Sequence, residues 1–161
     1  MNKQGDLFTD HPKVQKPKFM YIGCADSRVT PERIFNVTDS SGEIFVVRNV
    51  GNQVNDTSTL AAVQYAVDHL HIPEIVICGH TGCGAVRACL CDNWLPRELG
   101  TWLMPIRVDF ENKKYDTERG YIECNVTNQV KHLQGLYPSI KIGGYIYDLK
   151  TGLLDPIKTV E

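Results

Sequence analysis

The chain has 161 residues, of which 42% are hydrophobic and 22% are charged, and its formal net charge is -2. This length suits a single folded domain with a sizeable core. The small net charge gives no reason to expect nucleic acid or an anionic membrane as a partner. No apolar run approaches the ~20 residues that a membrane-spanning helix needs. We therefore expect neither a nucleic-acid-binding protein nor a membrane protein.

The N-terminal stretch MNKQGDLFTDHPKVQKPKF is polar with scattered Pro and Lys, which indicates neither a secretory signal nor a transit peptide. Six cysteines would indicate disulfides in a small secreted protein, but this chain is longer and well supplied with aliphatic residues. Free thiols or metal ligands in a reducing compartment are the better interpretation. We expect a soluble cytoplasmic protein, with an organellar location left open.

Residues 1–17 are interpreted as an extended N-terminal arm, because Pro12 and Pro17 oppose a long helix there. Residues 18–161 are expected to form one domain. Three nearly continuous apolar runs predict strands covered on both faces: KFMYIG (18–23), EIFVVRN (43–49) and EIVICG (74–79).

Helical patterns alternate with these strands. Helices are predicted over 31–36, over 56–70, directly after the third strand and, with a weaker pattern, over 117–134. Within residues 92–120 we expect only a helix-bearing insertion. Residues 141–149 predict a strand, and LLDP (153–156) an edge strand beyond a turn. This alternation predicts an α/β fold with a mostly parallel sheet.

Two groups of reactive side chains follow predicted strands. Cys24, Asp26 and Arg28 stand at alternate positions after the first strand, and His80 and Cys83 follow the third. In parallel sheets, sites collect at the carboxyl ends of the strands. Two residues separate His80 from Cys83, so both can reach one ion, and Cys24 can supply a third ligand if the two strands are neighbours. A Cys₂His set is a known catalytic zinc arrangement that leaves the fourth position open.

Asp26 is close enough to Cys24 in sequence to serve the same site. A carboxylate beside zinc can accept a hydrogen bond from the nucleophilic water, or it can bind the metal as a fourth ligand in a closed state. Arg28 decides between these two roles, because a guanidinium that pairs both carboxylate oxygens holds Asp26 off the metal.

These residues also allow plainer interpretations. His80 alone would more often be a structural histidine. Gly79, Gly82 and Gly84 fit a strand-to-helix turn, because they lack the spacing of a dinucleotide-binding loop. The remaining cysteines are interpreted as buried or surface thiols: Cys78, Cys89, Cys91 and Cys124.

Three motifs in this order resemble the β-class carbonic anhydrases: CADSRV (24–29), FVVRNVGN (45–52) and GHTGCGA (79–85). The resemblance extends from about residue 15 to residue 152. It implies a parallel sheet of about four strands flanked by helices, and a homodimer or higher even oligomer. It also implies one zinc ion per chain, bound by Cys24, His80 and Cys83.

The resemblance further implies that the Asp26–Arg28 pair is catalytic and that Gln15 donates a hydrogen bond to the substrate. The residues implied to line an apolar pocket for carbon dioxide are Phe45, Val50 and Tyr65. The arm is shorter than in many members, which leaves dimer and tetramer open. Tyr21 stands where bicarbonate-regulated members carry a tryptophan.

The function implied by the resemblance is zinc-dependent, reversible hydration of carbon dioxide to bicarbonate and a proton. Two alternatives stay open. The same scaffold can host hydrolysis of a sulfur analogue such as carbonyl sulfide. The chain can also be a non-catalytic zinc protein in which Asp26 closes the site, although Arg28 argues against this, since a closed four-ligand site does not need it.

Overall fold

The protein is described by a computed structural model that covers residues 13–38, 41–91 and 94–157. Its strands are β1 (Phe19–Cys24), β2 (Ile44–Asn49), β3 (Glu74–His80), β4 (Lys141–Tyr147) and β5 (Leu154–Pro156). Its helices are α1 (Pro31–Ile34), α2 (Thr57–Asp68), α3 (Gly84–Leu90), α4 (Arg97–Phe110) and α5 (Glu118–Leu136). Every strand and helix predicted from the sequence is present, and α4 is the helix expected within residues 92–120.

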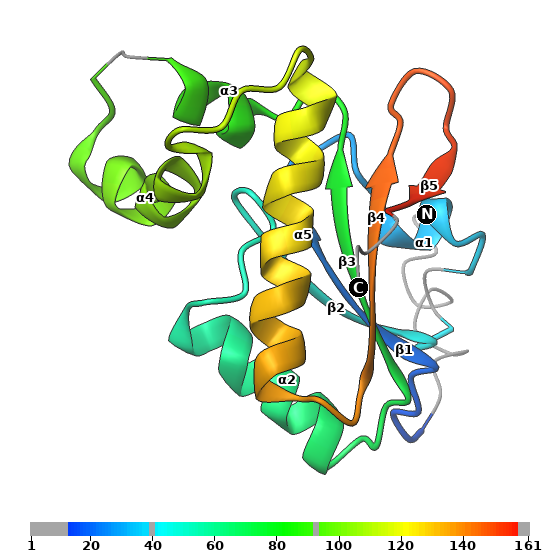
Figure 1. The fold of residues 1–161 in the computed structure, drawn as a ribbon. Helices are drawn as coiled ribbons and strands as arrows, with labels where there is room; N and C mark the ends of the chain where they lie inside the picture. The colour runs from blue at the N-terminus through cyan, green and yellow to red at the C-terminus, as the bar shows by residue number, and fades with distance from the viewer. Residues whose placement is uncertain (1–12, 39–40, 92–93, 158–161) are drawn as a thin grey trace, which may run out of the picture.

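The strands form one sheet in the order β2-β1-β3-β4-β5. The first four strands are parallel, and β5 runs antiparallel to β4 at the edge. The predicted mostly parallel sheet with an added edge strand is thus confirmed. Because β1 and β3 are direct neighbours, with Gly23 opposite Cys78, the chain leaves both strands at the same edge of the sheet. Figure 1 shows this carboxyl edge at the head of the β3 arrow.

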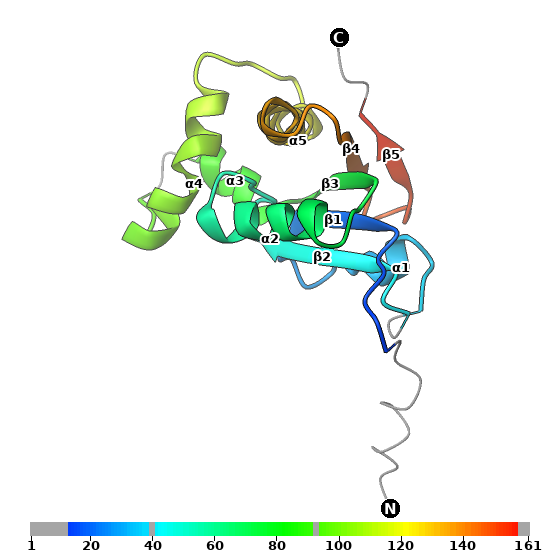
Figure 2. The same cartoon turned by 90° about the horizontal axis from the view of Figure 1, so that it is seen from below.

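Helices α2 and α5 cover one face of the sheet, and the short helix α1 lies on the other side (Figure 2). The core between the sheet and the two long helices consists of aliphatic side chains, among them Met20, Ile22, Val63, Ile75, Ile77, Val126, Val130 and Leu133. The opposite face buries Tyr21, Val76 and Cys78 beside Phe35. Burial on both faces explains the nearly continuous apolar character of β1 and β3. The prediction that β2 is also covered on both faces is wrong for the chain as described, because β2 is an edge strand in which no residue is fully buried.

Helix α5 packs unusually close to the carboxyl end of β3. A Cβ atom at Gly79 would lie 2.7 Å from Cγ2 of Val126 and 3.0 Å from Cγ2 of Ile122. A larger residue would push the helix away from the strand. Gly79 therefore fixes the distance between α5 and the segment that carries His80.

Asp56 caps the start of helix α2. Its side chain accepts hydrogen bonds from the backbone amides of Ser58 and Thr59, each at 3.0 Å, which satisfies two amides that the first helical turn leaves open. Within the described part of the chain, no helix is long and apolar enough to cross a membrane.

Candidate metal centre

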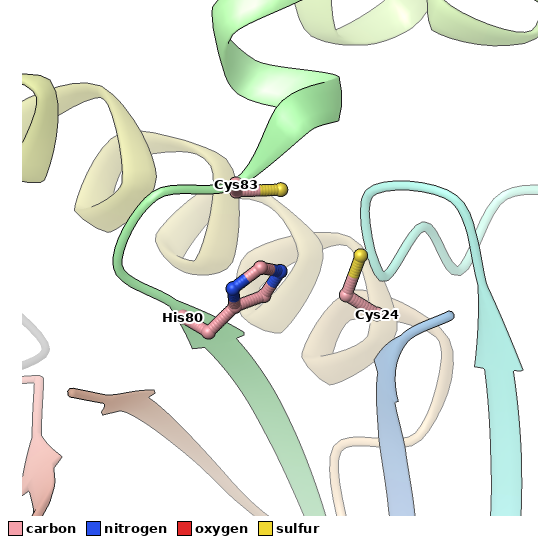
Figure 3. Close-up of side chains that lie close together, drawn as sticks. All are labelled: Cys24, His80 and Cys83. Carbon is pink, nitrogen blue, oxygen red and sulfur yellow. The ribbon is translucent and has the colours of Figure 1, made fainter. Parts of the chain in front are cut away.

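Cys24, His80 and Cys83 meet at the carboxyl edge of the sheet. Cys24 ends β1, His80 ends β3, and Cys83 immediately precedes α3. Their ligand atoms all lie within 4.8 Å of one another, and all three residues are buried. Figure 3 shows the side chains converging from these three segments. The strand order that the prediction required, with β1 beside β3, is what brings them together.

The imidazole of His80 is oriented for metal binding. Its Nδ1 atom lies 3.0 Å from the carbonyl oxygen of Thr81, so the ring proton belongs on Nδ1 and Nε2 carries the free lone pair. Nε2 is buried without a hydrogen-bond partner among the described residues. An orphaned buried nitrogen is costly. A metal ion would satisfy it, and a second ring nitrogen bonded to a carbonyl is the usual arrangement of a metal-binding histidine.

The thiols of Cys24 and Cys83 can also serve as ligands of a metal cation. Contact with the thiol of Cys83 is the main effect that lowers the pKa of Cys24, so Cys24 is the sulfur that ionises more easily. In the same contact Cys83 keeps its proton and donates it to the Cys24 sulfur, and this hydrogen bond, followed by burial, raises the pKa of Cys83. A divalent cation would replace the proton shared between the two sulfurs and let both thiols ionise. The donor set therefore fits zinc, which prefers thiolate and imidazole ligands.

Asp26 is held by Arg28 in a two-point ion pair. Nε and Nη2 of Arg28 donate to Oδ1 and Oδ2 of Asp26 at 2.9 and 2.7 Å, and the backbone amide of Arg28 also donates to Oδ1 at 3.0 Å. The hydrogen bonds from Arg28 hold the pKa of Asp26 well below its usual range. Oδ2 of Asp26 still lies 3.9 Å from Nε2 of His80. The carboxylate is thus ionised, directed to Arg28 and adjacent to the ligand set.

Arg48 of β2 fixes the backbone that carries Cys24 and Asp26. Its Nε donates to the carbonyl oxygen of Cys24 at 2.9 Å, and its Nη2 donates to that of Asp26 at 2.6 Å. Nη2 of Arg28 donates to the carbonyl of Gly82 at 3.2 Å, which ties this segment to the loop between His80 and Cys83. None of these three contacts was predicted from the sequence, because all three acceptors are backbone atoms that every residue type carries.

Of the four residues predicted to bind substrate, three lie away from the metal centre. Gln15 is exposed in the segment that leads into β1. Phe45 pairs with Met20, four residues before Cys24, which corresponds to about 13 Å along the strand. The ring centroids of Phe45 and Tyr65 are 6.1 Å apart. Only Val50, which follows β2, lies at the carboxyl edge.

One chain therefore assembles the predicted zinc ligands together with Asp26 and Arg28, and it leaves most of the predicted substrate residues apart from them. Gln15 precedes β1 and Phe45 lies near the start of β2, so both are toward the amino ends of strands whose carboxyl ends carry the metal centre. Tyr65 belongs to α2, which lies toward that same end in Figure 1. Their roles in substrate binding stay predictions.

Comparisons with known proteins agree on one family. A family model described as carbonic anhydrase matches residues 19–154. Among curated proteins, a carbonic anhydrase of Candida albicans is 32% identical and aligns with 98% of this chain and 62% of its own length. A carbonic anhydrase of Emericella nidulans is 34% identical, over 87% of this chain and 69% of its own length. The chain thus spans about two thirds of the length of these relatives.

Solved structures give the same result. A tetrameric β-carbonic anhydrase of Sordaria macrospora superimposes with a TM-score of 0.81 at 29% identity, over 89% of this chain and 82% of that one. The Coccomyxa β-carbonic anhydrase in complex with acetazolamide gives a TM-score of 0.79 at 32% identity, over 96% of this chain and 78% of that one. The chain belongs to the β-carbonic anhydrase family.

Proposed function

We propose that this protein catalyses the zinc-dependent, reversible hydration of carbon dioxide to bicarbonate and a proton. The observation that carries the proposal is the buried Cys24–His80–Cys83 set, whose ligand atoms lie within 4.8 Å of one another, with an ionised carboxylate 3.9 Å from Nε2 of His80. The curated relatives named carbonic anhydrase support the same activity.

Cys24, His80 and Cys83 would hold one zinc ion per chain. Three protein ligands leave a fourth position, which is the pattern of catalytic rather than structural zinc sites. A zinc ion in such a site supplies Lewis acidity, which makes water a nucleophile near neutral pH. The remaining chemistry falls to side chains of the protein.

Asp26 would accept a hydrogen bond from the attacking water and so direct an oxygen lone pair toward carbon dioxide. Arg28 occupies both carboxylate oxygens, so Asp26 is kept in one orientation at little further entropic cost. This ion pair favours the catalytic function over the non-catalytic zinc protein, in which Asp26 would have to leave Arg28 to become a ligand.

Carbon dioxide is uncharged, so contact with apolar side chains must hold most of it. We infer that Phe45 and Tyr65 form this pocket in the site of a second subunit, with Gln15 donating a hydrogen bond to the oxygen on which charge develops. Their place toward the amino end of the sheet supports an action between chains rather than within one. Val50 would line the pocket of its own chain.

A homodimer would provide that second subunit. Strand β2 is an edge of the sheet, and an unpaired apolar edge favours association with another chain. Val46, Val50 and Tyr65 are 37%, 41% and 46% exposed on this side of the molecule. These exposed apolar residues support a dimer that buries β2 and α2 of both chains, as the smallest active unit.

Stopped-flow hydration of carbon dioxide with a pH indicator tests the proposed activity directly. The expected result is zinc-dependent turnover, with about one zinc ion per chain by metal analysis. Carbonyl sulfide assayed in parallel is expected to react far more slowly. A zinc-loaded protein that leaves carbon dioxide unhydrated at neutral and at mildly alkaline pH would refute the proposal, and preferential turnover of carbonyl sulfide would favour the hydrolase.

A further inference from the structure

Helix α4 buries one face and exposes the opposite one. Leu103, Ile106 and Phe110 pack into the core of the protein. Residues that recur at alternating steps of four and three lie on one face of a helix. On the side of α4 away from the core, the residues at these steps are all exposed: Arg97, Thr101, Met104, Val108 and Glu111. We call these five residues the outer stripe of α4; its last member, Glu111, directly follows the helix.

The centre of the outer stripe is apolar. Met104 and Val108 are 53% and 54% exposed, and Leu90 of α3, which lines the same groove as Met104, is 41% exposed. In both views of the fold, α4 lies at an outer edge of the molecule (Figures 1 and 2). Single exposed apolar side chains are ordinary on a protein surface, but neighbouring ones indicate contact with another molecule. The outer stripe is therefore a candidate interaction surface.

The two ends of the outer stripe carry opposite charges. The stripe begins with Arg97 and ends with Glu111, on either side of the apolar centre. The ion pairs among the described residues involve neither of these side chains. About 21 Å of helix axis separates them, so they cannot pair with each other within one chain. A second copy of the stripe that runs antiparallel would place an arginine opposite a glutamate at both ends and one apolar centre against the other.

The same antiparallel arrangement matches a projecting side chain with a groove. Trp94, three residues before the stripe, is 85% exposed, which is unusual for so large an apolar side chain. At the other end of the stripe, α3, α4 and the start of α5 enclose a groove of about 450 Å³. Its apolar lining consists of Leu90, Met104, Phe110 and Tyr121 together with Cys89. Antiparallel pairing brings Trp94 of one chain toward this groove of the other.

We propose that the outer stripe of α4 is a contact surface between two copies of this chain, whose α4 helices pack antiparallel about a two-fold axis near Met104. Arg97 of each chain then pairs with Glu111 of the other, and Trp94 of each chain enters the groove of the other. A two-fold contact requires such a self-complementary surface. The contact uses residues other than those proposed for the interface along β2 and α2, and it does not require the zinc chemistry proposed above.

A second copy fits the outer stripe better than a partner of one charge. An acidic partner would pair with Arg97 and repel Glu111, and a basic partner would do the reverse. The contact is short, because the 14 residues of α4 span about 21 Å, and interfaces that are stable alone bury roughly 1,600 Å². We therefore expect association that depends on the protein concentration. Where copies already pair through β2 and α2, this contact would join two such pairs.

Charge reversal at the ends of the outer stripe tests the antiparallel pairing. Arg97→Glu and Glu111→Arg each bring like charges together at both ends of the contact, and either substitution is expected to weaken association by about tenfold or more. Both substitutions in one chain restore opposite pairs, so the double variant is expected to associate as the wild type does. The double variant also puts an acid at the start of α4 and a base at its end, which the helix dipole favours, so it should fold. Sedimentation velocity over a concentration series measures the mass of each assembly.

Glu98→Arg is the matched control. It changes the charge in the same way as Glu111→Arg and on the same helix, but Glu98 lies about 100° around the helix axis from Arg97, outside the outer stripe. Wild-type association is expected. Equal weakening in Glu98→Arg and Glu111→Arg would overturn the proposal, because it would show that any added positive charge on α4 opposes association.

Trp94→Ser tests the apolar part of the contact. Trp94 is exposed, so its loss should not disturb folding, and association is expected to weaken by about tenfold. This effect should persist at high salt, which screens the ion pairs but not the apolar contact. Unchanged association in Trp94→Ser and in both single charge variants would overturn the proposal. Failure of the double variant to recover association would do the same, since repulsion between like charges would then not be the cause of the loss.

Tyr65→Ser distinguishes this contact from the interface along β2 and α2. Tyr65 belongs to α2, so chains with this substitution should still form pairs through α4, and the addition of Glu111→Arg should dissociate those pairs. A Tyr65→Ser protein that stays monomeric across the whole concentration series would overturn the proposal.

Discussion

The two ends of the sheet differ in how complete they are within one chain. At the carboxyl edge, the candidate zinc ligands converge, and two hydrogen bonds from Arg28 hold the carboxylate of Asp26 beside them. Toward the amino end and along β2, the rings of Phe45 and Tyr65 pack against each other in a tilted arrangement, and Val46 and Tyr65 are partly exposed. The first region has the parts of a metal centre, and the second has the character of an interface.

The difference arises from how each set of residues is brought together. Parallel neighbours β1 and β3 place their last residues side by side, so backbone topology alone delivers Cys24 and His80 to one point. No element of the same chain carries Gln15 or Phe45 to that edge. In the proposed mechanism, a substrate pocket that uses them needs a second chain, so substitutions in the two regions should have different effects.

The largest effect is expected from Cys83→Ser. A serine hydroxyl is a poor zinc ligand, so zinc content should fall from about one ion per chain to nearly none and hydration should become undetectable. Metal analysis of the purified variant checks this. Cys91→Ser, which changes an exposed thiol, is the matched control and should keep both metal and activity. Full zinc occupancy in Cys83→Ser would remove Cys83 from the ligand set.

Asp26→Ala should keep its zinc and lose turnover. Without the carboxylate, the attacking water is no longer oriented, and a decrease of roughly a hundredfold in kcat is expected. Asp116→Ala removes an exposed carboxylate in the loop before α5 and should leave the rate unchanged. Unaltered turnover in Asp26→Ala, at full zinc content, would exclude Asp26 from the mechanism.

Tyr65→Ser tests the interface region. Tyr65 is 46% exposed and packs against Phe45 and His69. If it lies at the centre of a dimer contact, its loss should weaken association by about tenfold or more, with zinc content unaffected. Sedimentation velocity over a concentration series measures this. Leu153→Ser, at an exposed position beside β5, should not alter association, and equal dimer stability in both variants would contradict the proposed interface.

The smallest change is expected in thiol reactivity. Cys91 is the exposed cysteine and should react rapidly with an aromatic disulfide reagent in the zinc-loaded protein. Burial raises the pKa of Cys78 to about 12 and that of Cys89 to about 11, so both should stay unreactive at mildly alkaline pH.

Removal of zinc by a chelator should expose two further thiols to the same reagent, those of Cys24 and Cys83, which react more slowly than Cys91. Mass spectrometry of the labelled peptides identifies the sites. An identical labelling pattern before and after chelation would mean that these sulfurs do not hold the metal.

The sequence was informative where chemistry depends on the residue type. The strands could be predicted from their nearly continuous apolar runs. The convergence of Cys24, His80 and Cys83 beside the Asp26–Arg28 pair could be predicted because thiols, imidazoles and carboxylates at strand ends are uncommon. The hydrogen bonds from Arg48 could not be predicted, since their acceptors are backbone carbonyls. The hydrogen bond from Asn125 to the carbonyl oxygen of Gly51 could not be predicted either, because its acceptor is also a backbone atom. In the sequence, Asn125 only weakens the apolar pattern of a predicted helix.

The proposed mechanism requires that one site combine the metal centre of one chain with the pocket residues of another. Mixed dimers of Cys83→Ser and Gln15→Ala chains, isolated through two different tags, test this directly. Gln15 is exposed outside the strands and helices, so its replacement should not disturb folding. In the mixed dimer, the intact metal centre of the Gln15→Ala chain faces the intact Gln15 of its partner.

Each mixed dimer is expected to hold one complete site and to show about half of the wild-type activity per dimer, although both parent dimers are nearly inactive. Mixed dimers that are no more active than the average of their parents would contradict it, and would place Gln15 in the site of its own chain or outside the site altogether.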